Sequence, residues 1–187
     1  MKTELLIITA LESELNRAAL PQGVEIVYSG IGKINATLTT LKAIQELQPK
    51  RIVNFGTAGK VNPQLQGLLE IARVIQRDMQ TEPLAPRGQT PFCPRPFEYF
   101  SLSGEHLCGT GDNFVTTLDP WLHDQKVDVV DMELFAIATV AHQLGIPWQS
   151  FKYITDDANE DSGNDWQKKV NHGQALFLEK LTDLMKC

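Results

Sequence analysis

The sequence is poor in the residues that make disulfide frameworks and metal sites. Its three cysteines, Cys93, Cys108 and Cys187, show neither close pairing nor the spacing of a zinc site. Its four histidines lie far apart along the chain and form no metal-binding helix motif. We therefore expect reduced thiols, as in the cytoplasm, and neither a disulfide framework nor a catalytic metal.

Clustered positive charge and long apolar runs are also absent. The chain has 17 Lys and Arg against 23 Asp and Glu, which gives a formal net charge of -6, and its basic residues are scattered singly. Because a nucleic-acid surface needs a basic stripe, we expect no nucleic-acid partner. The apolar run near the N-terminus is interrupted by Glu12 and Glu14 and is too short for a signal peptide or a membrane span.

The chain does contain enough apolar material for one buried core. With 42% hydrophobic and 21% charged residues and no internal repeat or linker, it fits a single domain over residues 1–187. A strand, a glycine turn, a helix and a second strand between residues 24 and 55 predict a right-handed βαβ unit. We therefore expect an α/β fold with a central twisted sheet, mostly parallel but mixed, flanked by helices.

Apolar patterns predict the individual elements. Strands are expected over residues 5–9, 24–29, 51–55, 70–76, 105–108, 127–131 and 148–155, and helices over 33–47, 133–144 and 165–185. The strand at 51–55 should run into a turn, Gly56-Thr57-Ala58-Gly59. The loop from Pro83 to Pro96 contains five prolines. A loop this long inside a compact domain predicts an interface or a lid.

Acidic side chains follow several of these strands. Glu133 and Asp156 stand at the ends of the strands at 127–131 and 148–155, where open α/β sheets place their ligand crevice. Glu14 follows the strand at 5–9, although it could instead open a short helix. We expect the three carboxylates to share one pocket, whereas Asp131 has no assigned role beyond a turn or a cap.

Glycine-rich segments and one aromatic residue accompany these acids. The pair Gly30 and Gly32 precedes a helix but matches neither a P-loop nor a full dinucleotide fingerprint. Asp112 could cap a following helix, and Phe114 could be a core residue or stack on a heterocycle. Acids, small residues and an aromatic face together suit a planar base attached to a sugar, whose N-glycosidic bond is cleaved by acid and base catalysis.

Five segments carry a resemblance to a known family. In order they are YSGIGKINAT, VNFGTAGKV, GTGDNFV, VDMELFAIA and YITDDAN. They resemble the motifs of the purine nucleoside phosphorylase and nucleosidase superfamily, and are most similar to those of the methylthioadenosine/S-adenosylhomocysteine nucleosidases. The resemblance implies a phosphorylase/hydrolase-like fold, hydrolysis of a purine nucleoside to free base and sugar, and no cofactor. It also implies a homodimer in which a neighbour's loop, here Pro83 to Pro96, helps to close the site.

The resemblance further implies which residues act. Glu14 matches the position that activates water, and Asp156 matches the acid that protonates N7 of the purine. The implied substrate-binding residues are Thr57, Ala58 and Gly59 near the ribosyl centre, Phe114 stacked on the base, and Met132 and Glu133 around the ribose.

Two other functions stay open, namely a purine nucleoside phosphorylase and an inactive purine-binding protein. Phosphorylases of the superfamily clamp phosphate with arginines, but this chain has Asn54 and Glu12 at the corresponding places, which favours hydrolysis. The chain is also shorter than the usual nucleosidase, between Leu20 and Val24 and before Gly109. The natural nucleoside and its 5′ substituent therefore stay open.

Overall fold

The computed structural model describes residues 3–117, 119–160 and 162–186, so Cys187 lies outside the described residues. The elements follow in the order β1 (Leu5–Thr9), a 3-10 helix η1 (Arg17–Ala19), β2 (Glu25–Tyr28), α1 (Lys33–Leu47), β3 (Arg51–Lys60), β4 (Leu68–Gln76), β5 (Glu98–Phe100), β6 (His106–Thr110), α2 (Pro120–Asp124), β7 (Val129–Asp131), α3 (Leu134–Gln143), β8 (Trp148–Asp156), α4 (Ser162–Lys169) and α5 (Gln174–Leu184).

The strands form one mixed sheet, as predicted; among the described residues it has eight strands, of which β5 was not expected. Its order is β2-β1-β3-β7-β6-β4-β5, and β8 pairs with both β3 and β4. The pairs β3–β7, β4–β5 and β4–β8 are antiparallel, and the other pairs are parallel. Strands β2 and β3 run parallel, as expected of a βαβ unit, but they do not pair with each other, because β1 lies between them.

Part of this sheet closes on itself, which the sequence did not predict. The pairings run from β3 through β8, β4, β6 and β7 and back to β3. The closure depends on the length of β3, whose last residues, Gly59 and Lys60, pair with β7. The prediction that the strand ends at Phe55 and that residues 56–59 form a turn was therefore wrong.

Small residues explain why β3 can continue. A Cβ atom added at Gly59 would lie 2.6 Å from Oδ1 of Asp156, and one at Gly56 would lie 3.2 Å from Nζ of Lys152. Glycine at both positions lets the strand pass directly beside two buried charged groups. The sequence pattern Gly-Thr-Ala-Gly therefore indicates close approach within a strand instead of a turn.

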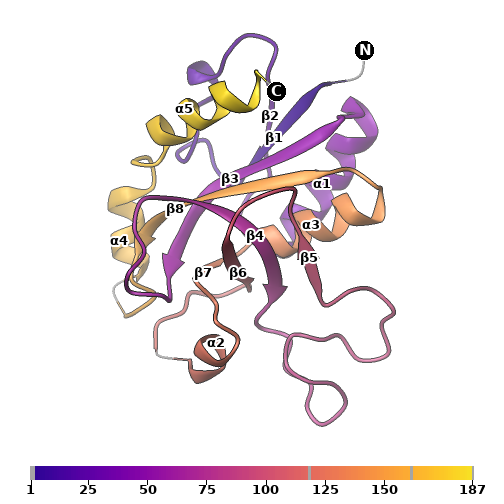
Figure 1. Ribbon diagram of the computed structural model, residues 1–187, viewed down its shortest axis with the longest axis vertical. Coiled ribbons are helices and arrows are strands. Elements are labelled where there is room, and N and C mark those ends of the chain that lie inside the picture. The colour runs from indigo at the N-terminus through magenta and orange to yellow at the C-terminus, as the bar shows by residue number, and fades with distance from the viewer. Residues whose placement is uncertain (1–2, 118, 161, 187) are drawn as a thin grey trace.

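Helices cover both faces of the sheet (Figure 1). Leu6 and Ile8 of β1 belong to the core cluster that includes buried residues of α1 and α3. Leu5 and Ile7 point the other way, into a cluster with α5 in which the rings of Phe177 and Phe55 stack with centroids 4.4 Å apart. Strand β1 is therefore buried on both faces, as predicted.

Helix α1 has the predicted bounds, but much of its apolar face points outward. Its buried residues are Ala36, Thr40, Ala43 and Ile44, and α1 packs against α3. Ile31, Ile34, Leu38 and Leu41, which we call the α1 apolar strip, are exposed, with Ile34 at 74%. Mostly small side chains face α3 and allow the two helices to pack closely, while the larger side chains of the strip face outward.

Two other predictions are corrected. The helix expected over residues 165–185 is two helices, α4 and α5. Gly173 lies between them, so close to Tyr153 that a Cβ atom would overlap that ring. Asp112 does not cap a following helix, since α2 is capped by Asp119. Instead, Oδ1 of Asp112 accepts a hydrogen bond of 2.7 Å from the backbone N–H of Lys33 at the start of α1.

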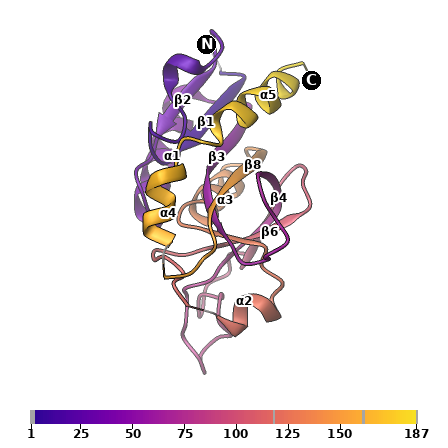
Figure 2. The ribbon, with the colours of Figure 1, turned by 90° about the vertical axis from the view of Figure 1, so that its left-hand side faces the viewer.

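The two ends of the molecule differ in character. Both chain ends lie at one end, and α2 lies at the other together with the long loop between β4 and β5 (Figures 1 and 2). This loop contains the predicted Pro83 to Pro96 segment. Among the described helices, none is long and apolar enough to cross a membrane.

Candidate active site

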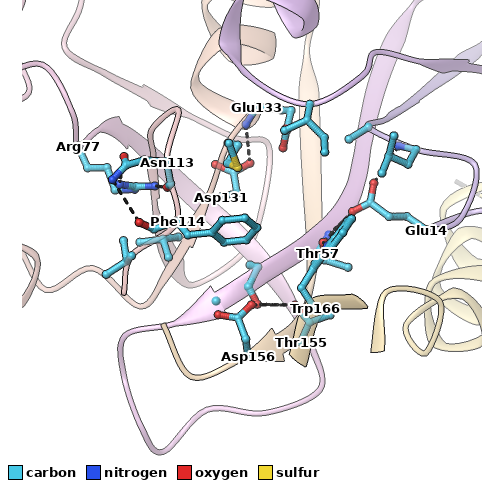
Figure 3. A pocket seen from close by; sticks show the side chains of 18 residues that line it. Glu14, Thr57, Arg77, Asn113, Phe114, Asp131, Glu133, Thr155, Asp156 and Trp166 are labelled. Atoms are coloured by element: carbon cyan, nitrogen blue, oxygen red, sulfur yellow. Dashed lines mark hydrogen bonds between the residues drawn. The ribbon is translucent and has the colours of Figure 1, made fainter. Parts of the chain in front are cut away.

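One cavity gathers all the site residues that the sequence predicted (Figure 3). It lies where the ends of β3, β7 and β8 meet the segments that follow β1 and β6, and α4 contributes Trp166. Its empty volume, including the part open to solvent, is about 670 Å³. The predicted residues that line it are Glu14, Thr57, Ala58, Gly59, Phe114, Met132, Glu133 and Asp156.

Glu14 is a buried residue of the cavity lining and is fixed by four hydrogen bonds. Oε1 accepts from the backbone N–H of Thr57 at 2.9 Å and from its hydroxyl at 2.8 Å. Oε2 accepts from the hydroxyl of Thr9 and from the backbone N–H of Leu11, both at 3.1 Å. All four partners donate, which suits a carboxylate that is held in one orientation. Glu14 does not open a regular helix, because the next helical residues are those of η1.

Glu133 stands at the N-cap position of α3 and is only 8% exposed. Its Oε1 accepts a hydrogen bond of 2.9 Å from the backbone N–H of Gly32, whose φ of +95° requires glycine. Burial, together with the nearby negative charge of Asp131, raises the pKa of Glu133 from 4.5 to about 8. This carboxyl group is therefore largely protonated at neutral pH.

Asp131, which lines the cavity, forms a buried ion pair with Lys152, which lies deeper in the protein. Lys152 Nζ lies 2.7 Å from Oδ2 of Asp131. Burial opposes both charges, but their mutual attraction outweighs it, so the pKa of Lys152 is raised and that of Asp131 is lowered. Asp131 also accepts from the backbone N–H of Leu134 at 2.8 Å and from the hydroxyl of Thr110 at 2.5 Å. Its role is thus to begin α3 and to anchor β6, β7 and β8 together.

Asp156 ends β8 on the opposite side of the cavity from Glu133 (Figure 3). Its Oδ2 accepts from the hydroxyl of Thr155 and its Oδ1 from the backbone N–H of Ala158, both at 3.0 Å. The adjacent Asp157 is exposed and pairs with Lys60 at 2.9 Å. This second acid therefore faces solvent and not the cavity.

Phe114 is half exposed and its ring points into the cavity, so it is not a core residue (Figure 3). The loop that carries it is held by the buried Arg77. The guanidinium donates to the carbonyl groups of Gly109 and Gly111, both at 3.2 Å, and to the carbonyl and side chain of Asn113. No motif marked Arg77 in the sequence, because its partners are mostly backbone carbonyls of another segment.

Trp166 is another cavity residue that the sequence did not predict. It lies near the start of the segment that was predicted as one helix over residues 165–185. In the structure it lines the cavity, and its indole Nε1 donates a hydrogen bond of 2.9 Å to Oγ1 of Thr57. The break between α4 and α5 gives α4 its own direction, which the sequence pattern did not reveal.

Within the described ranges, no three His, Cys, Asp or Glu side chains are grouped so as to hold a metal ion.

This fold and cavity define a known class of protein. The chain matches the family described as the phosphorylase superfamily over residues 21–108 and 104–185, and it belongs to that family. Among curated proteins it is 26% identical over 185 residues to 5'-methylthioadenosine/S-adenosylhomocysteine nucleosidase of Anoxybacillus flavithermus, covering 87% of this chain and 79% of that one. It is also 26% identical over 185 residues to aminodeoxyfutalosine nucleosidase of Helicobacter pylori, covering 84% and 79%.

Solved structures show the same fold. A Helicobacter pylori methylthioadenosine nucleosidase mutant with 5'-methylthioadenosine in its active site superposes with a TM-score of 0.86 at 21% identity, covering 98% of this chain and 99% of that one. Streptococcus pyogenes S-adenosylhomocysteine nucleosidase, in complex with 5-methylthiotubericidin, gives 0.78 at 21% identity, covering 92% and 91%.

Proposed function

We propose that this protein is a nucleosidase, which hydrolyses the N-glycosidic bond of a purine nucleoside of the methylthioadenosine or S-adenosylhomocysteine kind. The products are the free base and the sugar. The similar curated proteins carry nucleosidase names. The cavity offers two carboxylates, Glu14 and Asp156, with a third, Glu133, and the ring of Phe114 between them.

The chemistry of such a bond fits these positions. Asp156 gives a proton to N7 of the base, the bond to the ribosyl carbon breaks, and positive charge develops on the sugar. Glu14 takes a proton from a water molecule, whose oxygen bonds to that carbon. Each positioned acid or base contributes a factor of about 10² to 10⁴ in rate. The protons balance, because Asp156 loses one to the base and Glu14 gains one from the water.

The remaining lining residues would hold the substrate. Phe114 stacks on the planar base, while Met132 and Glu133 embrace the ribose. One side of the cavity is formed by Thr57, Ala58 and Gly59 of β3. These small residues let the sugar approach the backbone. Glu133 accepts hydrogen bonds from the ribose hydroxyl groups most strongly as the anion, so substrate binding should draw the proton off this residue.

The charges around the cavity favour hydrolysis over phosphorolysis. Among the described residues that line the cavity, Arg77 alone is cationic, and its guanidinium already makes four hydrogen bonds to residues 109–113. Asn54 is buried elsewhere, where it donates to the carbonyl of Ile8 at 2.9 Å and accepts from the hydroxyl of Ser150 at 2.8 Å. A phosphate would therefore meet carboxylates and no free cation.

A base-release screen tests the proposal. The protein is incubated with a set of purine nucleosides that differ at the 5′ position, in phosphate-free buffer, and free base is measured by chromatography. We expect release from one or more 5'-thioether adenosines, unchanged when phosphate is added. Release only after phosphate is added would favour a phosphorylase. Binding without any release would favour a purine-binding protein.

We also infer that the protein is a homodimer. The α1 apolar strip is an exposed patch of the kind that marks an interface, and its first residue, Ile31, also lines the cavity. A second copy placed on the strip would thus reach the cavity rim, and the loop containing Pro83 to Pro96 could complete the cover.

The free thiols of Cys93 and Cys108 support a reducing compartment such as the cytoplasm.

A further inference from the structure

Thr57 sits between two other polar groups of the cavity, and its hydroxyl has a single proton to give. Oγ1 lies 2.8 Å from Oε1 of Glu14 and 2.9 Å from the indole Nε1 of Trp166. A threonine hydroxyl can both donate and accept, so either contact alone would leave the direction of its proton undetermined. The two contacts together determine it.

The indole decides the direction. A tryptophan N–H can only donate, so Oγ1 of Thr57 must accept from Trp166. The carboxylate of Glu14 can only accept, so the hydroxyl proton points to it. The hydrogen bonds therefore run in one direction, from Trp166 through Thr57 to Glu14.

This chain of hydrogen bonds joins three distant parts of the sequence. Trp166 belongs to α4, Thr57 to β3, and Glu14 to the segment after β1. All three side chains line the cavity, on the side opposite Phe114 (Figure 3). Helix α4 packs against β8, the direct neighbour of β3 in the sheet. The indole is thus supported by the same strands that supply Thr57 and Asp156.

We propose that Trp166 is a positioning residue for the water-activating carboxylate. Its N–H occupies an acceptor position of Thr57 and keeps the hydroxyl proton on Glu14, so the hydroxyl does not turn to donate to the oxygen of the attacking water. A water oxygen that accepts such a bond has less electron density to offer the sugar carbon. The proposal rests on the nucleosidase function and adds to it a residue that acts through another.

The consequence is a selective effect on turnover. Trp166→Phe keeps an aromatic wall but removes the N–H. Because one net hydrogen bond is worth on the order of 1 kcal/mol, kcat should fall by about 3- to 10-fold. KM should change by less than about 2-fold, since the lost bond touches Thr57 and not the substrate.

A double-mutant cycle separates this role from simple packing. Thr57→Val removes the hydroxyl, so Trp166→Phe should have no further effect on kcat in that background. Thr57→Ser keeps the hydroxyl and should preserve the full effect of Trp166→Phe. Trp121→Phe, in α2 and outside the cavity, is the matched control and should leave kcat unchanged. Equal kcat for Trp166→Phe and wild type, losses that multiply in the double variant, or an effect on KM alone would overturn the proposal.

A spectroscopic measurement needs no activity. In the ¹H–¹⁵N NMR spectrum, the indole signal of Trp166 should shift in Thr57→Val and stay near its wild-type position in Thr57→Ser. If the indole signal does not shift in Thr57→Val, the hydrogen bond is not formed, and the proposal is refuted. If the wild-type protein instead releases no base from any nucleoside, the nucleosidase function fails, and the NMR result still decides whether the chain of hydrogen bonds exists.

Discussion

Because the carboxyl group of Glu133 is protonated in the folded protein, we expect the stability of the protein, measured without a ligand, to depend on pH in an unusual way. The folded state keeps this proton up to about pH 8, whereas the unfolded chain releases it near 4.5. Between these values the native state binds one more proton than the unfolded state. The free energy of unfolding should therefore fall as the pH rises, by about 1 kcal/mol per pH unit.

The substitution that isolates this effect is Glu133→Gln, which is neutral at every pH and can still accept from the backbone N–H of Gly32. Over the whole interval the wild-type loss is of the order of a few kcal/mol. The variant should lack that loss, so it should be more stable than wild type at pH 8, and the difference should shrink toward pH 5. The two buried neighbours do not affect the pH dependence between pH 5 and 8. The lowered pKa of Asp131 changes stability only below its ordinary pKa of 3.8, and the raised pKa of Lys152 changes it only above 10.5.

Urea unfolding of the ligand-free protein at pH 5, 6, 7 and 8 measures the effect. Glu25→Gln, on an exposed side chain at the start of β2, is the control and should follow the wild-type slope. Parallel curves for wild type and Glu133→Gln across this range would refute the assignment of a proton to Glu133.

The remaining predictions concern catalysis, the buried ion pair and assembly. Glu14→Gln should lower kcat for base release by about 10² to 10⁴ and leave nucleoside binding intact in calorimetry; a variant with normal kcat would remove Glu14 as the base. Asp156→Asn should abolish release while a labelled nucleoside still binds, and retained turnover would assign the acid elsewhere. Lys152→Met leaves Asp131 buried and unpaired and should cost roughly 3–5 kcal/mol in urea unfolding, whereas Lys152→Arg keeps the charge and should cost much less; equal losses would contradict the ion pair. Leu38→Glu on the α1 apolar strip should convert a dimer to monomer in sedimentation velocity, with exposed Lys42→Glu as control, and a wild-type monomer would exclude the dimer.

The sequence predicted most of the framework because the framework depends on local patterns. Continuous apolar runs such as residues 5–9 predict strands buried on both faces, and β1 is one. The helix predicted over residues 133–144 likewise ends where expected, because Gly145 follows it and adopts the positive φ that is common after a helix end. What failed was non-local. The closing of β3 onto β7 depends on glycines that pass buried charges, and these charges come from β8.

The candidate site shows the same division. Glu14, Glu133 and Asp156 could be predicted because strand ends collect ligand-binding side chains, and all three line one cavity. Lys152 could not be, because an isolated lysine inside an apolar strand shows nothing of the buried Asp131 that neutralises it. Trp166 and Arg77 act through partners from other segments, so only the three-dimensional arrangement reveals them.

The most direct test of hydrolysis in this cavity is an isotope measurement with the wild-type protein. Incubation with 5'-methylthioadenosine in phosphate-free buffer made with ¹⁸O-enriched water should release adenine and place one ¹⁸O atom in the released sugar, as detected by mass spectrometry. The same experiment with Glu14→Gln should give neither product at a comparable rate. Absence of adenine from the wild-type reaction, or a sugar that forms only as its phosphate ester once phosphate is added, would contradict the proposed function.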